Sequence, residues 1–120
     1  MKLTVGIRMK YYDELISGNL RLRLEKEIMD WPDVSTKKMF GCPCYMTNEK
    51  IFVFLVTNGI VITQLEPDEL NDLRKLTTTE YFQAGKRTVK KWIKIPVASE
   101  VELMQLFPYI KMSYNSLMGD

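Results

Sequence analysis

The dipeptide Asn58-Gly59 lies between two runs of apolar residues, and it limits the possible folds more than any other feature of the chain. Both residues tolerate positive φ, which a two-residue hairpin turn requires, so the pair predicts that strands over residues 50–56 and 60–64 are antiparallel neighbours. Asn48-Glu49 predicts a similar turn after a candidate strand over residues 38–47. The three segments together predict an antiparallel meander.

This meander is expected to be apolar on both faces. Side chains alternate along a strand, so Val53 and Leu55 should share one face while Phe52 and Phe54 share the other. Both faces then need a cover. One core beneath the C-terminal helix is expected to contain four aliphatic residues: Val53, Leu55, Val61 and Leu103.

Helical patterns come before and after the meander. A short helix is predicted over residues 11–17, ended by Gly18, and a second over residues 20–30, closed by Pro32. Pro67 at a first helical position, followed by acidic residues, predicts a helix through Leu76.

The last part of the chain predicts a second hairpin and a final helix. The hairpin spans residues 81–95 around Gly85-Lys86, and Ser99 with Glu102 has the spacing of a capping box. Pro108 should kink or split the helix that follows. The fold class is therefore α+β, with an antiparallel sheet of about five strands, N-terminal helices and a kinked C-terminal helix in a single domain over residues 1–120.

Composition excludes several classes of function. The chain contains no histidine, which excludes Ser-His or Cys-His catalysis and histidine-ligated metals. Its formal charge of +2 gives no global attraction to nucleic acid or anionic membrane. The longest apolar run, residues 51–56, is far too short to span a bilayer, and residues 1–10 show no export signal. We expect a cytoplasmic protein with no membrane partner.

Cys42-Pro43-Cys44 is the first candidate for chemistry. Two thiolates could bind a soft metal or form a redox couple, but no other cysteine is present to complete a zinc site. The favoured interpretation is two buried structural thiols, with no metal and no cofactor. The aromatic and methionine side chains nearby could line a ligand pocket, although core packing is the favoured interpretation: Trp31, Met39, Phe40, Tyr45 and Met46.

A basic cluster is the second candidate. No acidic residue occurs between Tyr81 and Ser99, whereas five basic residues do, together with one tryptophan. They could grip phosphates while the indole stacks on an unpaired base. The favoured alternative is a solvated edge strand that lysines protect from edge-to-edge association. The candidate contact residues for nucleic acid or a partner are Lys86, Arg87, Lys90, Lys91, Trp92 and Lys94.

Several local motifs occur in the order found in one known family. They are Met39-Phe40-Gly41, the hairpin around Asn58-Gly59, the turn at residues 85–87, the segment 92–96 and a terminal helix ending near Tyr114. In this order the chain resembles the TfoX N-terminal domain family over residues 31–117. Cys42 replaces the family's usual second glycine, and residues 89–93 replace a methionine-rich strand, which indicates a divergent branch. A more distant similarity is to YjbR-type proteins, which have been discussed as DNA-binding.

The resemblance implies an α+β domain found in regulators of competence gene expression, with no catalytic residues to carry over. The leading hypothesis is therefore a non-enzymatic interaction or regulatory domain that acts through protein contacts, as a homo-oligomer. The alternative is a nucleic-acid-binding module that uses the basic strand Lys86 to Lys94. An enzyme based on Cys42 and Cys44 ranks third.

Overall fold

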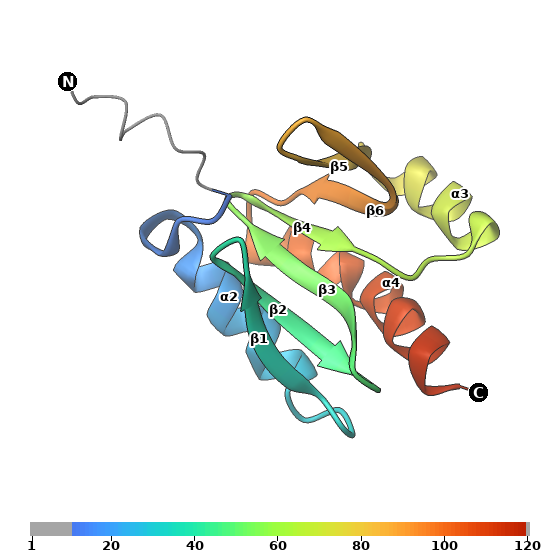
Figure 1. The fold of residues 1–120 in the computed structure, drawn as a ribbon, viewed down its shortest axis with the longest axis horizontal. Coiled ribbons are helices and arrows are strands. Elements are labelled where there is room, and N and C mark those ends of the chain that lie inside the picture. Colours follow the sequence, from blue (N-terminus) through green and yellow to red (C-terminus); the bar gives the residue numbers. More distant parts are fainter. Residues whose placement is uncertain (1–10, 120) are drawn as a thin grey trace.

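Six strands form one antiparallel sheet in the computed structural model, which describes residues 11–119 (Figure 1). Their order across the sheet is β1-β2-β3-β4-β6-β5. The strands are β1 (Ser35–Met39), β2 (Cys42–Thr47), β3 (Lys50–Val56), β4 (Gly59–Ile62), β5 (Glu80–Ala84) and β6 (Arg87–Pro96). The fold class is α+β, as predicted, and the β3–β4 and β5–β6 hairpins are confirmed. The prediction about an export signal in residues 1–10 lies outside the described residues.

The expected strand over residues 38–47 is in fact two strands, so about five strands was too few. Phe40 and Gly41 both have positive φ, 55° and 77°, and they form the turn between β1 and β2. A non-glycine residue such as phenylalanine rarely adopts this conformation. Of the two turn residues, only Gly41 is of a type that favours positive φ, so the sequence indicated this turn weakly.

One helix, α2 (Glu14–Ile28), replaces the two helices predicted near the N-terminus. Gly18 lies inside it rather than ending it. The buried side of α2 runs without interruption through Ser17, Leu20 and Leu24, and packing of that stripe outweighs the helix cost of about 1 kcal/mol for one glycine. The hydroxyl of Ser17 also accepts a hydrogen bond from the Asn58 N–H at 2.8 Å, which ties α2 to the β3–β4 turn.

The two later helices begin where their caps predict. α3 (Pro67–Leu76) has Pro67 in its first turn, and α4 (Glu100–Met118) begins after Ser99, whose hydroxyl accepts from the Glu102 N–H at 3.2 Å. α4 continues across Pro108 as one helix, so the predicted split is wrong and the kink is not confirmed. Buried residues on both sides of Pro108 hold the helix on the sheet. No helix within residues 11–119 is long and apolar enough to cross a membrane.

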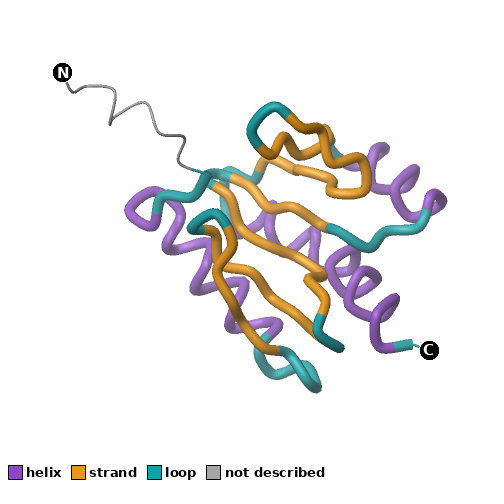
Figure 2. Tube along the Cα trace, viewed as in Figure 1, coloured by secondary structure: helices purple, strands orange, loops and turns teal. Residues whose placement is uncertain are grey.

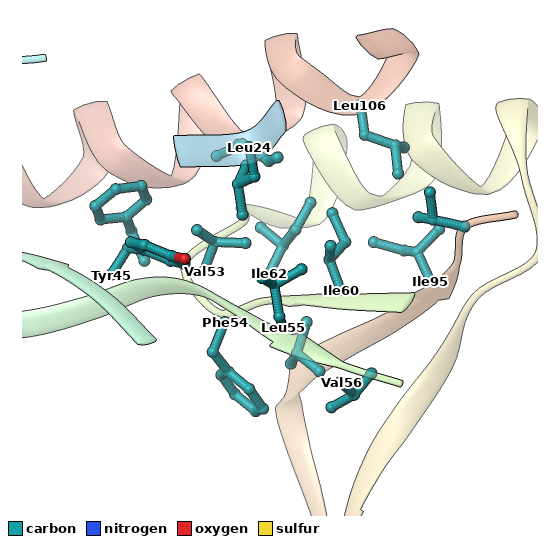
Figure 3. Packing of buried hydrophobic residues seen from close by; sticks show 14 of the residues in the cluster. Leu24, Tyr45, Val53, Phe54, Leu55, Val56, Ile60, Ile62, Ile95 and Leu106 are labelled. Atoms are coloured by element: carbon teal, nitrogen blue, oxygen red, sulfur yellow. The ribbon is translucent and has the colours of Figure 1, made fainter. Parts of the chain in front are cut away.

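Helices α2 and α4 lie side by side against one face of the sheet (Figures 1 and 2). Val53, Ile60 and Ile62 point toward these helices, whereas Phe54 and Val56 point away (Figure 3). Val61 is directly opposite Phe54 in the β3–β4 register. Directly paired residues share a face, so the prediction that Val61 lies beneath α4 is wrong, although it is fully buried.

Phe52 also differs from its predicted face. Tyr45 pairs with Val53 and Met46 pairs with Ile51, which leaves Phe52 as the extra residue of a β-bulge. The bulge turns the Phe52 ring to the helix side, where it contacts Trp31 and Tyr114 with ring centroids 6.2 Å and 5.3 Å away. Strict alternation along β3 therefore fails at this residue.

The face of the sheet that points away from α2 and α4 is covered by aromatic side chains, several of them from the β1–β2 and β5–β6 hairpins. Phe54 contacts Phe82 of β5 and Trp92 of β6, with ring centroids 5.2 Å and 5.3 Å apart. Tyr11 lies between Phe82 and Phe40, and its hydroxyl accepts a hydrogen bond from the Gly85 N–H at 2.8 Å. Both apolar faces are thus covered, one by helices and one by hairpins.

Candidate functional site

The six residues of the predicted basic cluster lie in different settings along the β5–β6 turn and β6. Lys86 and Arg87 are exposed at the β5–β6 turn. Lys94 is directly opposite Glu80 on β5, with its Nζ 4.0 Å from a carboxylate oxygen. The ring of Trp92 is half-buried, with the ring centroids of Phe54 and Phe82 at 5.3 Å and 5.9 Å from its own.

Lys90 and Lys91 lie in a bulge of β6. Val89 pairs with Phe82 and Ile93 pairs with Tyr81, so the residues between them have no partner on β5. The two lysines border a hollow of about 400 Å³ beside α3, which Arg74 and Glu66 also line. The glutamate partly offsets the basic charge, and the structure does not unite the six predicted residues in one surface.

The protected-edge interpretation of residues 86–94 is wrong in one respect. Lys94 lies in the part of β6 that pairs with β4, residues 93–96, so it is internal to the sheet. Residues 87–92 of β6 have no partner on β4, so that side of the strand is an open edge at Lys90 and Lys91. Lys37 and Lys38 lie on the edge strand β1, where all but the last residue are exposed, so edge protection by lysine applies there as well.

Cys42 and Cys44 are buried, uncrosslinked thiols on β2. Burial raises the pKa of Cys42 to about 12 and that of Cys44 to about 11. The Cys44 thiol donates to the carbonyl oxygen of Cys42 at 3.4 Å. Thiols with such pKa values are protonated at neutral pH, which makes them poor nucleophiles. Within residues 11–119, no group of three or more His, Cys, Asp or Glu side chains could hold a metal ion.

A polar network that the sequence analysis missed joins α2 to β2. The Arg21 guanidinium contacts Glu14 through Nε at 2.9 Å and Nη2 at 2.8 Å, and its Nη1 is 3.1 Å from Glu25. The Tyr12 hydroxyl donates to Glu14 at 2.6 Å, and the Tyr45 hydroxyl donates to Glu25 at 2.6 Å. Five side chains therefore form one continuous chain of hydrogen bonds.

The network shifts the pKa values of its members. Hydrogen bonds from Arg21 and then Tyr12 lower the pKa of Glu14 to about 2. Burial raises the pKa of Tyr45 above its usual range, and the hydrogen bond to Glu25 adds to the shift. The spacing of Glu14, Arg21 and Glu25 places them on one side of a continuous helix, but the expected break at Gly18 hid that signal.

The side of α2 that faces away from the sheet carries a row of exposed apolar residues, with the exposed Asn19 and Lys26 between them. Leu15 is 97% exposed, Leu22 is 58% exposed and Met29, at the C-cap, is 39% exposed. The sequence analysis did not identify these residues, because it considered only the buried stripe of the helix. Their spacing of seven residues was the signal that could have identified them.

Comparison of the chain with protein-family models, with curated proteins and with solved structures finds no match.

Proposed function

We propose that this chain is a non-enzymatic interaction domain of the TfoX N-terminal type, and that it associates with a second copy of itself through the outer face of α2. The observation that carries the proposal is the exposed stripe Leu15, Leu22 and Met29. Isolated exposed aliphatic residues are ordinary on a protein surface, but an aligned row on one helix is typical of an interface.

The spacing of the stripe suits helix pairing. Residues seven apart are almost two full helical turns apart, so all three side chains lie on one line about 21 Å long. An antiparallel pair with its two-fold axis at Leu22 would place Leu15 of one copy against Met29 of the other. A two-fold arrangement uses the same patch on both copies, and this stripe is suited to such self-pairing.

Helix α4 extends the surface. Its exposed apolar residues Val101 and Met104 are 66% and 48% exposed. α4 lies beside α2, and the Arg23 guanidinium of α2 stacks over the Phe107 ring of α4 at 5.1 Å. A stable interface needs about 800 Å² on each partner, and two adjacent helices offer more area than α2 alone.

Sedimentation equilibrium across a concentration series tests this proposal. Wild-type protein should reach the mass of a dimer, and Leu22→Glu should shift the equilibrium to monomer because the pair would bury two facing carboxylates. Leu76→Glu is the matched control, since Leu76 is 47% exposed on α3 and lies outside the stripe. A wild-type protein that stays monomeric throughout, or a dimer that Leu22→Glu leaves intact, would contradict it.

Nucleic-acid binding is the second candidate, supported by the exposure of Lys86, Arg87, Lys90 and Lys91. The packing of the Trp92 ring against Phe54 and the pairing of Lys94 with Glu80 weigh against it. We expect oligonucleotide affinity no tighter than about 10⁻⁴ to 10⁻⁶ M at physiological salt, as for nonspecific electrostatic association. Tight binding that is lost when Lys90, Lys91 and Lys94 are all changed to glutamine would favour this candidate instead.

A further inference from the structure

A cavity of about 610 Å³ opens between α2 and the β1–β2 hairpin. This volume lies within the range of about 300 to 1,000 Å³ found for small-molecule sites. Its walls include all five members of the polar network. Tyr45 is fully buried, whereas the Arg21 and Glu25 side chains are 26% and 30% exposed. The cavity therefore has a polar floor that is buried at Tyr45 and open to solvent at Glu14, whose side chain is 53% exposed.

The register of β1 and β2 shows which edge side chains belong to this cavity. Thr36 is opposite Tyr45 and Lys38 is opposite Pro43, while Lys37 is opposite Cys44. The Tyr45 hydroxyl reaches Glu25 on α2, so Tyr45 and its partner Thr36 face the helix. Lys38 shares that face, whereas the Lys37 side chain belongs to the opposite one, although Lys37 also borders the cavity.

The mouth of the cavity is left open at Gly41. A Cβ atom placed there would meet no atom within 4 Å, so the backbone is not packed against anything at this position. Lys38, beside it on β1, is exposed, and no carboxylate within residues 11–119 forms an ion pair with it. An ammonium group at the mouth is therefore available to an anionic group.

The floor keeps unused hydrogen-bonding capacity. The Tyr12 and Tyr45 hydroxyls each donate to a glutamate, which leaves each phenol oxygen able to accept a hydrogen bond. Each carboxylate oxygen of Glu25 accepts one hydrogen bond, from Arg21 or from Tyr45, and can accept another. The floor thus offers acceptors to a molecule that carries donors.

The network helps to hold α2 against β2, but apolar packing of similar volume can stabilise a fold as well as linked ionic groups do. Fold stability alone therefore does not require polar groups at this place. The cavity is lined by three cations, Arg21, Lys37 and Lys38, and by two carboxylates, Glu14 and Glu25. Because both signs of charge are present, the site favours a ligand with opposite character at its two ends rather than a simple ion.

We propose that this cavity binds a small polar molecule that has an anionic group at one end and hydrogen-bond donors at the other. The anionic group contacts Lys38 at the mouth, and the donors contact Glu25 and the Tyr45 oxygen at the floor. Amino acids, hydroxy acids and sugar phosphates share this chemistry. The site is separate from the outer face of α2, so it stands whether the protein is a monomer or a dimer.

Heteronuclear NMR titration tests the proposal with three probes: serine, glycerate and glycerol phosphate. At least one should cause saturable shifts of the amides of residues 36–38 and 41–45. Lys38→Ala should weaken that binding about tenfold or more, since a charge-assisted hydrogen bond is lost. Lys50→Ala, at an exposed lysine of β3 that does not line the cavity, is the control and should leave the affinity unchanged.

The probes also separate the sources of the ligand. If Glu25→Gln weakens the binding of serine more than the binding of glycerate, the ligand group at the floor is an ammonium. If Glu25→Gln weakens the binding of glycerate more, that group is a hydroxyl. Glycerol phosphate binding alone identifies a phosphate at the mouth. The proposal is overturned if no probe causes saturable shifts, if the shifts map away from β1 and β2, or if Lys50→Ala and Lys38→Ala weaken binding equally.

Discussion

Leu55→Ala should destabilise the fold more than most single substitutions. Leu55 is fully buried in β3, opposite the fully buried Ile60. Removing its carbons beyond Cβ forfeits about 2.4 kcal/mol of transfer free energy at about 0.8 kcal/mol per group. Any volume that fails to collapse adds about 24 cal/mol per Å³. β3 is held between β2 and β4, so little collapse is expected, and the total should be about 3 to 4 kcal/mol.

Urea denaturation followed by tryptophan fluorescence measures this loss directly. A loss of that size should also lower the melting temperature by roughly 10 to 20 °C for a chain of this length. Leu76→Ala, at a residue 47% exposed on α3, should cost far less and serves as the control. A free energy of unfolding for Leu55→Ala within error of wild type would refute the placement of Leu55 in the core.

Two further predictions follow from the shifted pKa values. Glu14 has a pKa of about 2 in the folded state against 4.5 in an unperturbed chain, so its contribution to stability is complete above about pH 4.5 and is lost as the pH falls toward 2. In wild-type protein the urea midpoint should therefore fall over that pH interval, and Glu14→Gln should make the fall smaller. An unchanged fall in the variant would show that the ion pair with Arg21 contributes nothing to stability. The thiols of Cys42 and Cys44 should resist alkylation by iodoacetamide at about pH 8 and react once the protein is unfolded, because burial keeps them protonated. Rapid labelling of folded protein, or one equivalent of zinc retained through purification, would contradict that assignment.

The parts of the fold that were predictable from sequence are those with local signals. Asn58 supplies the positive φ of the β3–β4 turn, although the two turn residues are Thr57 and Asn58 and Gly59 already belongs to β4. Pro67 begins α3 and Ser99 caps α4, each through the chemistry of one or two adjacent residues. The failures arose where tertiary packing outweighs a local preference. Gly18 lies within α2 because Ser17 and its neighbours are buried against the sheet.

The turn at Phe40 and the bulge at Phe52 were hidden for a related reason. Phe40 adopts positive φ without being Gly or Asn, and Phe52 departs from alternation because of its pairing with β2. Neither property can be deduced from the neighbouring residues in the sequence.

The candidate sites likewise combine features that the local sequence indicates with features that only the tertiary structure shows. Charge alone located the basic residues, but the bulge in β6 and the pairing of Lys94 with Glu80 decide that they do not form one surface. The network between Tyr12 and Tyr45 joins residues from two layers of the fold. Its helical members could have been recognised only if α2 had been predicted as a single helix.

A disulfide crosslink at Leu22 tests the proposed self-association most directly. In helices packed about 8 to 10 Å apart, facing Cα atoms come within about 4 to 6 Å, which a disulfide can bridge. The native cysteines are buried, so a cysteine introduced at the exposed position 22 would be the reactive thiol. Under mild oxidation, Leu22→Cys should yield a covalent dimer while Leu76→Cys remains a monomer. Failure of Leu22→Cys to crosslink, or equal crosslinking at both positions, would contradict association through the outer face of α2.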